Sequence, residues 1–387
     1  MNEHDGAGEP TLGLSRRRVG ASGMGILALS ATAAGSTVTA SCGSPGHSPQ
    51  SGSLAPGSPA PRTARVGWVL SHEQFPTAQL VEFAAAAEQA GFSHLWASDH
   101  LQPWQHNEGH AAFPWLTLGL VSQRTRTVVF GTGVTCPIYR HHPTEVAQAF
   151  ATLTELAPGR VFLGVGTGEA LNELAGTGQF GRYAERHDRL IEAITLIRQL
   201  WSGQRVSFRG RYFQTEQLQL YDLPKSPPPI YVAAGGPKSA TLAGQYGDGW
   251  ITTGATVDPR LRAAFAQGAR AGGKDPAHMP IFLETFVVVG DRSDLDYAAQ
   301  RWRFLAAPPT AHLVDQPNPV TIEQTVARVP LPQVSASWVV GTDPARHIAA
   351  AQKLLDTGIT PFIHAAQADP RRVIDFYGQH VLPQLHT

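Results

Sequence analysis

Short runs of apolar and β-branched residues alternate along the chain with longer segments whose apolar positions recur at helical spacing. Eight strands that alternate with helices predict parallel β–α–β units, and therefore a (β/α)8 TIM barrel over residues 64–387. A doubly wound parallel sheet is the alternative arrangement of the same units. The predicted strands are Arg65–Leu70, His94–Ser98, Thr127–Gly131, Val161–Val165, Ile230–Ala234, Trp250–Thr253, Ile281–Val289 and Pro361–His364. The predicted helices include Ala78–Ala90, Thr144–Leu156, Arg186–Trp201, Pro259–Ala271 and Pro344–Thr357.

Two segments are longer than a plain strand–helix unit requires, namely Ser202–Pro229 and Ala306–Val340. Insertions in a barrel usually lie near its active face, so we expect both segments to shape access to a site there. Helix boundaries are marked as well: Pro143 and Asp343-Pro344 are typical of helix starts, and Gly91 of a helix end.

The first 63 residues have the composition of an export segment and a linker. Arg16 and Arg17 precede a weakly apolar stretch of small residues, which is the pattern of a twin-arginine (Tat-type) signal over residues 1–41. Cys42 follows small residues in a way that resembles a lipobox, so lipid anchoring at Cys42 is one expectation. Residues 42–63 are rich in Pro, Ser and Gly and form a linker. We therefore expect the protein in the cell envelope, with peripheral or lipid-anchored membrane association.

Charge and composition exclude several classes of protein. The chain carries 30 Lys+Arg against 30 Asp+Glu, so it lacks the cationic excess that phosphate backbones attract and we expect no nucleic-acid partner. Two cysteines are too few for a disulfide framework or a Cys-type zinc site. A hydrophobic share of 42% with only 16% charged residues is enough for a large core.

Polar residues follow the predicted strands at the points where barrels place their reactive groups. Glu73 follows the first strand, Asp99-His100 the second, and the glycine-rich stretch that ends in Glu169 the fourth. Tight glycine turns also follow the third and fifth strands, and His364 ends the eighth. Histidine is suited to general-base work near neutral pH, whereas an Asp-His pair alone is more often an ordinary cap.

Two motifs point to chemistries that the sequence does not support. His106 and His110 have the spacing of zinc ligands on a helix, but Gly109 lies between them and no acidic residue completes the motif, so we expect no metal site. Gly164–Glu169 approaches the dinucleotide fingerprint GxGxxG, but Glu169 stands where the last glycine belongs. The glycines still allow close backbone approach to a flat ligand beside a carboxylate.

Taken together, three motifs resemble the luciferase-like barrel family in its coenzyme F420-dependent dehydrogenase branch. They are Ser71–Phe75, Ser98–Trp104 and Gly164–Glu173, and the similarity extends from Val66 to Leu385. The resemblance implies a homodimer that binds F420, a deazaflavin with a long anionic tail, and a non-proline cis peptide at Gly133–Val134. It also implies catalytic roles for His100, Glu169, Trp104 and Glu73. Coenzyme contacts carry over to Asp99, Gly133, Val134, Cys136, Asn172, Gly235, Gly236, Lys238 and Ser239, with Cys136 standing where the family has a Thr.

The substrate is inferred from where the chain departs from that branch. The sugar-phosphate members hold their phosphate with two lysines and an arginine, and this chain has Thr256, Gln324 and Ser337 at the matching positions. Charge-assisted hydrogen bonds are about twice as strong as neutral ones, so a phosphate substrate is disfavoured. The exported members that act on hydroxymycolic acids lack that clamp, and the chain resembles them; the implied reaction oxidises a secondary alcohol to a ketone, with His100 as base.

Three alternatives remain at the level of sequence. The chain could be an F420-dependent dehydrogenase of another alcohol, including a sugar phosphate, or an FMN-dependent monooxygenase of the same barrel family. It could also be a non-catalytic envelope binding protein built on an enzyme fold. The combination of His100, Glu169 and Trp104 argues against the last of these.

Overall fold

Eight parallel strands close into a barrel in the computed structural model, which describes residues 64–386. The strands pair in chain order around the ring, and β9 bonds to both β1 and β7, which closes it. The predicted (β/α)8 barrel is confirmed, and the doubly wound alternative is wrong. The barrel strands are β1 (Gly67–Leu70), β2 (His94–Ala97), β3 (Val129–Thr132), β4 (Val161–Val165), β5 (Ile230–Ala233), β6 (Gly249–Thr253), β7 (Ile281–Val288) and β9 (Ile359–Ala365).

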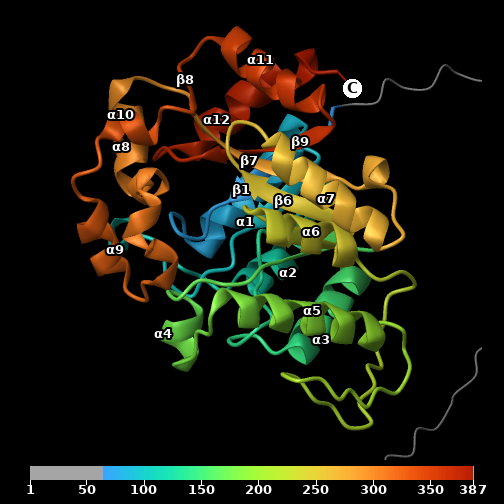
Figure 1. Ribbon diagram of the computed structural model, residues 1–387. Coiled ribbons are helices and arrows are strands. Elements are labelled where there is room, and N and C mark those ends of the chain that lie inside the picture. The colour runs from blue at the N-terminus through green and yellow to red at the C-terminus, as the bar shows by residue number, and fades with distance from the viewer. Residues whose placement is uncertain (1–63, 387) are drawn as a thin grey trace, which may run out of the picture. The chain divides into compact units, whose positions relative to one another are not determined.

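Helices cover the outside of the barrel, as Figure 1 shows. The short strand β8 (Val339–Val340), which the sequence did not predict, pairs with the end of β7. The main helices are α1 (Thr77–Ala90), α2 (Pro114–Arg124), α3 (Pro143–Leu156), α5 (Tyr183–Leu200), α6 (Pro237–Tyr246), α7 (Pro259–Ala271), α11 (Pro344–Leu355) and α12 (Pro370–Phe376). Four further helices lie in the connections: α4 (Glu173–Thr177), α8 (Arg292–Arg301), α9 (Pro319–Val326) and α10 (Leu331–Val334).

Local sequence signals explain where several helices begin and end. Helix α3 begins at Pro143, and the Asp343 side chain caps α11 by accepting a hydrogen bond from the Ala345 N–H at 3.0 Å. Gly91 ends α1 with a φ of 102°, a left-handed conformation that glycine adopts without steric cost. These boundaries were predicted and are confirmed.

The barrel interior is filled by aromatic side chains. The Trp96 and Phe362 rings stack with centroids 4.0 Å apart, and Phe282 packs against Phe362 with centroids 4.9 Å apart. Phe162 contacts Phe282 edge-on. Side chains alternate between the two faces of a strand. A residue two positions after one of these aromatic residues therefore also faces the barrel interior, one layer closer to the carboxyl ends of the strands. The aromatic layer thus forms a floor beneath the carboxyl ends of the strands.

The two insertions differ in their relation to that end of the barrel. The second insertion reaches it, and Val314 and Asp315 line the large cavity described below. The expectation for the first insertion, Ser202–Pro229, is wrong. It connects the end of α5 to the start of β5, so it starts and ends at the opposite end of the strands. It then packs along the outer helices: Trp201, which precedes it, donates to the Ala147 carbonyl of α3, and Glu192 of α5 accepts from backbone N–H groups of the insertion.

The predicted Tat-type signal, the lipobox-like Cys42 and the linker lie outside the described residues. Within residues 64–386, no helix combines the length and the apolar character needed to cross a membrane.

Candidate active site

One cavity of about 1150 Å³ opens at the carboxyl ends of the barrel strands. Nine of the thirteen site residues predicted from the sequence line it: His100, Trp104, Gly133, Val134, Glu169, Gly235, Gly236, Lys238 and Ser239. The other four, Glu73, Asp99, Cys136 and Asn172, are buried around it. The structure therefore brings the predicted residues to one place.

Small residues form one half of the cavity wall. The peptide bond between Gly133 and Val134 is cis, as the resemblance implies. A Cβ atom on Gly133 would lie 2.7 Å from the Trp96 ring, and one on Gly166 would lie 2.7 Å from Cγ2 of Val134, so both positions require glycine. Ala233 continues this surface on β5. Such a wall lets a flat ring system approach the backbone closely.

The glycine loop after β4 is held in place by a buried arginine that the sequence analysis missed. Arg186 of α5 donates from Nη1 to the carbonyls of Thr167 at 3.0 Å and Gly168 at 2.7 Å. Its guanidinium also lies over the Phe180 ring, 4.0 Å from the centroid. Arg186 thus fixes the loop that carries Glu169.

A cationic rim lies beside the small-residue wall. Gly235 and Gly236 lead into the N-terminus of α6, where Ser239 Oγ accepts from the Gly236 N–H at 3.2 Å. Lys238 and Arg182 are exposed, line the cavity, and form no ion pair with another described residue. Helix N-termini carry partial positive charge, so this rim is suited to an anion.

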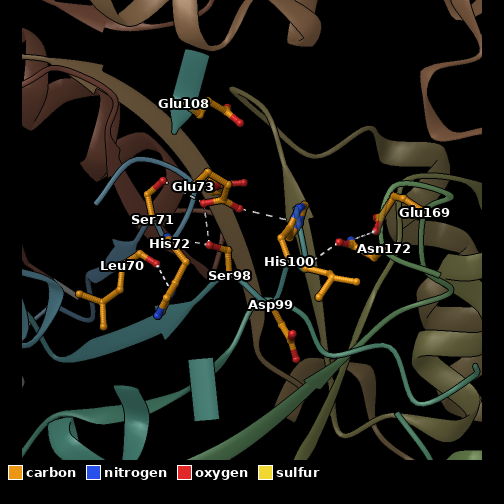
Figure 2. A network of polar contacts seen from close by, with 12 residues as sticks. Leu70, Ser71, His72, Glu73, Ser98, Asp99, His100, Glu108, Glu169 and Asn172 are labelled. Atoms are coloured by element: carbon orange, nitrogen blue, oxygen red, sulfur yellow. Dashed lines mark hydrogen bonds and ion pairs between the residues drawn. The ribbon is translucent and has the colours of Figure 1, made fainter. Parts of the chain in front are cut away.

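His100 lines the opposite half of the cavity, and Figure 2 shows the polar contacts around it. His100 follows β2, and its Nε2 lies 3.8 Å from Oε1 of Glu73, which follows β1. The hydroxyls of Ser98 and Ser71 donate to the other carboxylate oxygen of Glu73 at 2.7 and 3.0 Å. Burial opposes ionisation of Glu73, but His100 and the Ser98 hydroxyl outweigh it and lower the pKa of Glu73 below its usual value. An ionised carboxylate therefore faces the His100 imidazole.

Trp104 forms the wall next to His100, with ring centroids 5.8 Å apart. Its other neighbour is Phe304, on which it stacks at 4.7 Å and 13°. Between these two segments, Gln105 accepts from the Phe304 N–H at 2.9 Å and donates to the Gln300 carbonyl at 3.0 Å. The loop that carries the candidate base is thereby tied to the segment that follows α8.

Glu169 lines the cavity from the loop after β4, on the side remote from Glu73 in Figure 2. The Asn172 side chain donates to Glu169 Oε2 at 3.3 Å and accepts from the Leu101 N–H at 2.8 Å. Asn172 therefore links the loop of the candidate acid to the loop of the candidate base. A reaction that removes a proton at one place and delivers a proton at another requires a base and an acid in the same pocket, and His100 and Glu169 are candidates for these two roles.

Asp99 and Cys136 lie behind the wall. The Asp99 carboxylate contacts the Arg140 guanidinium at 2.5 Å and accepts from the Thr135 hydroxyl at 2.6 Å. Although burial opposes it, His141 and Arg140 keep the pKa of Asp99 well below its usual range. Burial raises the pKa of the Cys136 thiol well above its usual value, so this group is an unreactive, packed thiol.

Glu284 of β7 also lines the cavity, and the sequence analysis did not select it. Its Oε1 lies 2.7 Å from Nδ1 of the buried His364 of β9, a residue that was noted only for its place at a strand end. One feature of the sequence could have pointed to Glu284: it is the single acidic residue in the mostly apolar run from Ile281 to Val289. Glu284 also lines a neighbouring side cavity of about 310 Å³, together with Thr253, Phe286, Leu305, Ser337 and Trp338.

The positions matched to the phosphate clamp are dispersed. Thr256 and Ser337 line a cavity of about 190 Å³ that Lys353 also borders, whereas Gln324 is exposed on α9. The residues that line the side cavity include Glu284 and no Lys or Arg. His106 and His110 are exposed, and no group of three metal-ligating side chains occurs between residues 64 and 386.

The chain is similar to proteins and structures that are already known. Residues 60–360 match the family described as luciferase-like monooxygenase. An F420-dependent hydroxymycolic acid dehydrogenase from Mycobacterium tuberculosis (strain ATCC 25618 / H37Rv) is 61% identical over 328 residues, which is 84% of this chain and 90% of that protein. An F420-dependent glucose-6-phosphate dehydrogenase from Nakamurella multipartita is 38% identical over 338 residues, 84% of this chain and 98% of that protein.

A solved structure resembles the barrel as well. An F420-dependent secondary alcohol dehydrogenase in complex with an F420-acetone adduct has a TM-score of 0.75 and 32% sequence identity. The match covers 82% of this chain and 98% of that structure.

Proposed function

This chain belongs to the luciferase-like monooxygenase family, and we propose that within it the protein is a coenzyme F420-dependent dehydrogenase that oxidises the secondary alcohol of hydroxymycolic acids to a ketone. One observation supports this above the others. His100 and Glu169 lie in the same cavity, and a wall of small residues is available there for a flat ring. The resemblance to a hydroxymycolic acid dehydrogenase at 61% identity supports the choice of substrate.

The residues present fit the coenzyme. Gly133, Val134, Gly166 and Ala233 would hold the deazaflavin ring, since Cβ atoms at the two glycines would collide with neighbouring side chains. The α6 N-terminus and Lys238 would hold the phosphate of the tail, and Arg182 its carboxylates, because these cations have no ion-pair partner among the described residues. When bound, coenzyme F420 accepts a hydride from the alcohol carbon.

The chain's own residues supply positioning and proton transfer. His100 accepts the hydroxyl proton at an imidazole nitrogen, and the ionised Glu73 stabilises the charge that His100 gains. Glu169 holds a proton for the coenzyme, with its carboxyl oriented by Asn172. Trp104 covers His100 and keeps water from the reacting carbon.

Charge disfavours a sugar phosphate in this pocket. Glu284 lines the cavity, the ionised Glu73 lies against His100, and the side cavity that Glu284 also lines has no basic lining residue. A phosphate dianion there would face like charge without a cationic partner. A neutral alcohol on an alkyl chain is not repelled by the carboxylates and needs no cationic partner. Its alkyl chain could pack against Phe286, Leu305 and Trp338.

The proposal is tested by coenzyme binding and then by substrate choice. Purified mature protein is titrated with F420 by fluorescence quenching, with FMN and NADP as controls. We expect F420 to bind at least tenfold more tightly than either control. F420 reduction is then followed with a hydroxymycolic acid or a long-chain secondary alcohol, and with glucose-6-phosphate. Tighter binding of FMN would favour the monooxygenase alternative, and rapid sugar-phosphate oxidation would contradict the substrate assignment.

We also propose that the protein is exported through a Tat-type signal and held at the cell envelope, with a lipid anchor at Cys42. The twin arginines and the small residues before Cys42 support this. Replacing Arg16 and Arg17 by Lys should retain the protein in the cytoplasm, and Cys42→Ser should release the exported protein from membranes. Unchanged location in both variants would contradict export by this route.

The expected homodimer remains a proposal. Helices α2 and α3 border an apolar surface cavity of about 550 Å³, and Leu116, Leu120 and Leu156 nearby are 70%, 52% and 51% exposed. Exposed apolar residues in such number favour burial against a second copy. Leu116→Glu should convert the dimer to a monomer in analytical ultracentrifugation, and a wild-type monomer would contradict the proposal.

A further inference from the structure

Buried polar atoms without a hydrogen-bond partner gather behind His100. Among the described residues they include Gln74 Oε1, His100 Nδ1, Glu108 Oε1, Trp302 Nε1 and His364 Nε2. We call these groups, together with the Glu73 and Glu284 carboxylates, the polar cluster. Buried polar groups are normally hydrogen-bonded, and leaving one unpaired costs about 1–3 kcal/mol. Several such atoms together indicate ordered water that bridges them.

Contacts between these residues join them into one region. The Gln74 side chain donates to the Ala366 carbonyl, two residues beyond His364. The His364 ring lies edge-on to Trp302 at 4.4 Å. From the other side, Glu108 accepts from the Gln105 N–H at 3.0 Å, and Gln105 is bonded to the segment that follows Trp302.

The first part of the cluster pairs an ionised carboxylate with a protonated one. Burial and the nearby Glu73 carboxylate raise the pKa of Glu108 well above its usual value, whereas the pKa of Glu73 is lowered. Figure 2 shows Glu108 on the side of Glu73 away from Leu70 and His72. Two neighbouring carboxyl groups in opposite protonation states can exchange a proton without creating a second buried charge.

The second part is the pair formed by His364 and Glu284, at 2.7 Å between Nδ1 and Oε1. His364 is 2% exposed, and after His100 and the Ser98 hydroxyl it is a further cause of the lowered pKa of Glu73. Glu284 lies at the junction of the large cavity and the side cavity. The pair therefore leads from the polar cluster toward a space open to water.

The proposed reaction requires such a path. Because His100 lines the cavity, bound substrate and coenzyme would cover it on that side once it has accepted the hydroxyl proton. The proton must leave before the next turnover, and a route through the wall allows this while the cavity is filled.

We propose that the polar cluster is a water-bridged proton relay, which moves the proton from His100 through Glu73, which exchanges protons with Glu108, to the His364–Glu284 pair and out to the side cavity. Each transfer moves one proton and no electrons. His100 returns to the neutral imidazole, each relay group returns to its starting state, and the proton ends on solvent water. This inference rests on the proposed function, because it assumes that His100 is the base.

The kinetic test compares a single turnover with steady-state turnover. His364→Gln keeps size and hydrogen bonding but cannot carry a proton, and Glu108→Gln does the same for the carboxyl. With F420 and methyl ricinoleate, a long-chain secondary alcohol, we expect kcat to fall at least tenfold in each variant. The rate of F420 reduction in a single turnover should stay within about twofold, since the first proton still reaches His100.

A structural role would give a different result. His347 is also buried, and it bonds to Tyr377 away from the site, so His347→Gln controls for lost stability. Equal losses in single-turnover and steady-state rates, or unchanged kcat in both relay variants, would overturn the relay. A wild-type protein that reduces no F420 would instead contradict the proposed function.

A second measurement does not depend on turnover. A high-resolution crystal structure should show ordered water within hydrogen-bond distance of His364 Nε2 and Gln74 Oε1. A dry cluster would contradict the relay even if the kinetics were altered.

Discussion

Glu73 and His100 face each other from the ends of adjacent strands, with 3.8 Å between Oε1 and Nε2. Two serine hydroxyls bind the other carboxylate oxygen of Glu73, so its orientation toward the imidazole is fixed. The pair is positioned by β1 and β2, two strands that are hydrogen-bonded to each other in the barrel.

Removing the base should separate catalysis from coenzyme binding. We expect His100→Ala to lower kcat by about 10²–10⁴-fold, the usual contribution of a general base, while the dissociation constant for F420 changes less than about threefold. Steady-state kinetics and fluorescence titration measure the two quantities. His106→Ala is the matched control, because His106 is exposed and outside the cavity. A His100→Ala enzyme that keeps more than about a tenth of kcat would exclude this role.

The candidate acid can be tested with a neutral isostere. Glu169→Gln keeps an acceptor for the Asn172 side chain, so we expect unchanged thermal stability. It removes the titratable proton, so kcat should fall by about 10²-fold. If a fall in kcat is accompanied by an equal loss of folded protein in circular dichroism, Glu169 is structural instead.

The small-residue wall predicts a loss of coenzyme affinity on adding one methyl group. In Gly166→Ala the new Cβ would lie 2.7 Å from Cγ2 of Val134, so Val134 must shift at the cavity surface. We expect the dissociation constant for F420 to rise at least tenfold in fluorescence titration. Gly119→Ala on α2, with nothing within 4 Å of the new Cβ, should leave it unchanged. Wild-type affinity in Gly166→Ala would place the ring elsewhere.

The cationic rim predicts a salt-sensitive contribution from the coenzyme tail. Replacing Arg182 and Lys238 together by Ala should weaken F420 binding by about tenfold or more at low salt and flatten its salt dependence. The deazaflavin riboside that lacks phosphate and glutamates serves as the control ligand, and its affinity should not change. An equal loss of affinity for both ligands would show that Arg182 and Lys238 do not bind the anionic tail of the coenzyme.

The pH dependence of stability should contain a component from His94. Burial, with Arg65 nearby, lowers the pKa of His94 to about 4. Between the usual pKa of about 6.5 and about 4, the unfolded chain binds a proton that the folded chain does not, so the free energy of unfolding falls as the pH falls. The 2.5-unit difference corresponds to about 3 kcal/mol. Urea unfolding of wild type and His94→Gln at about pH 7.5 and pH 4.5 should show a loss that is larger in wild type by most of this amount. Parallel losses in both proteins would assign the effect to other groups.

The strands were predictable because each barrel strand is a continuous apolar run, and the positions of residues such as His100 and Glu169 followed from the rule that strand ends carry polar groups. Partnerships across the barrel were not predictable from spacing. The Asp99 carboxylate pairs with Arg140, 41 residues away, and the predicted contact of Asp99 with the coenzyme stays a prediction. Glu284 was missed because its partner, His364, lies 80 residues further on.

The first insertion shows a different limit. Its length suggested a role at the active face, but its place in the chain, after a helix and before a strand, assigns both its ends to the opposite face. The position of the insertion between a helix and a strand would have predicted its location better than its length did.

The segment after β7 packs as a cluster of its own, in which Trp302, Val334 and Trp338 meet Phe286 and Val288 of the barrel strand. It supplies outer walls of the pocket, whereas the groups proposed to move protons stand on β7 and β9 and on the loops that follow β1, β2 and β4. Substitutions in residues 303–340 can therefore change the length and bulk of the alcohols that the pocket accepts without altering the groups that transfer protons.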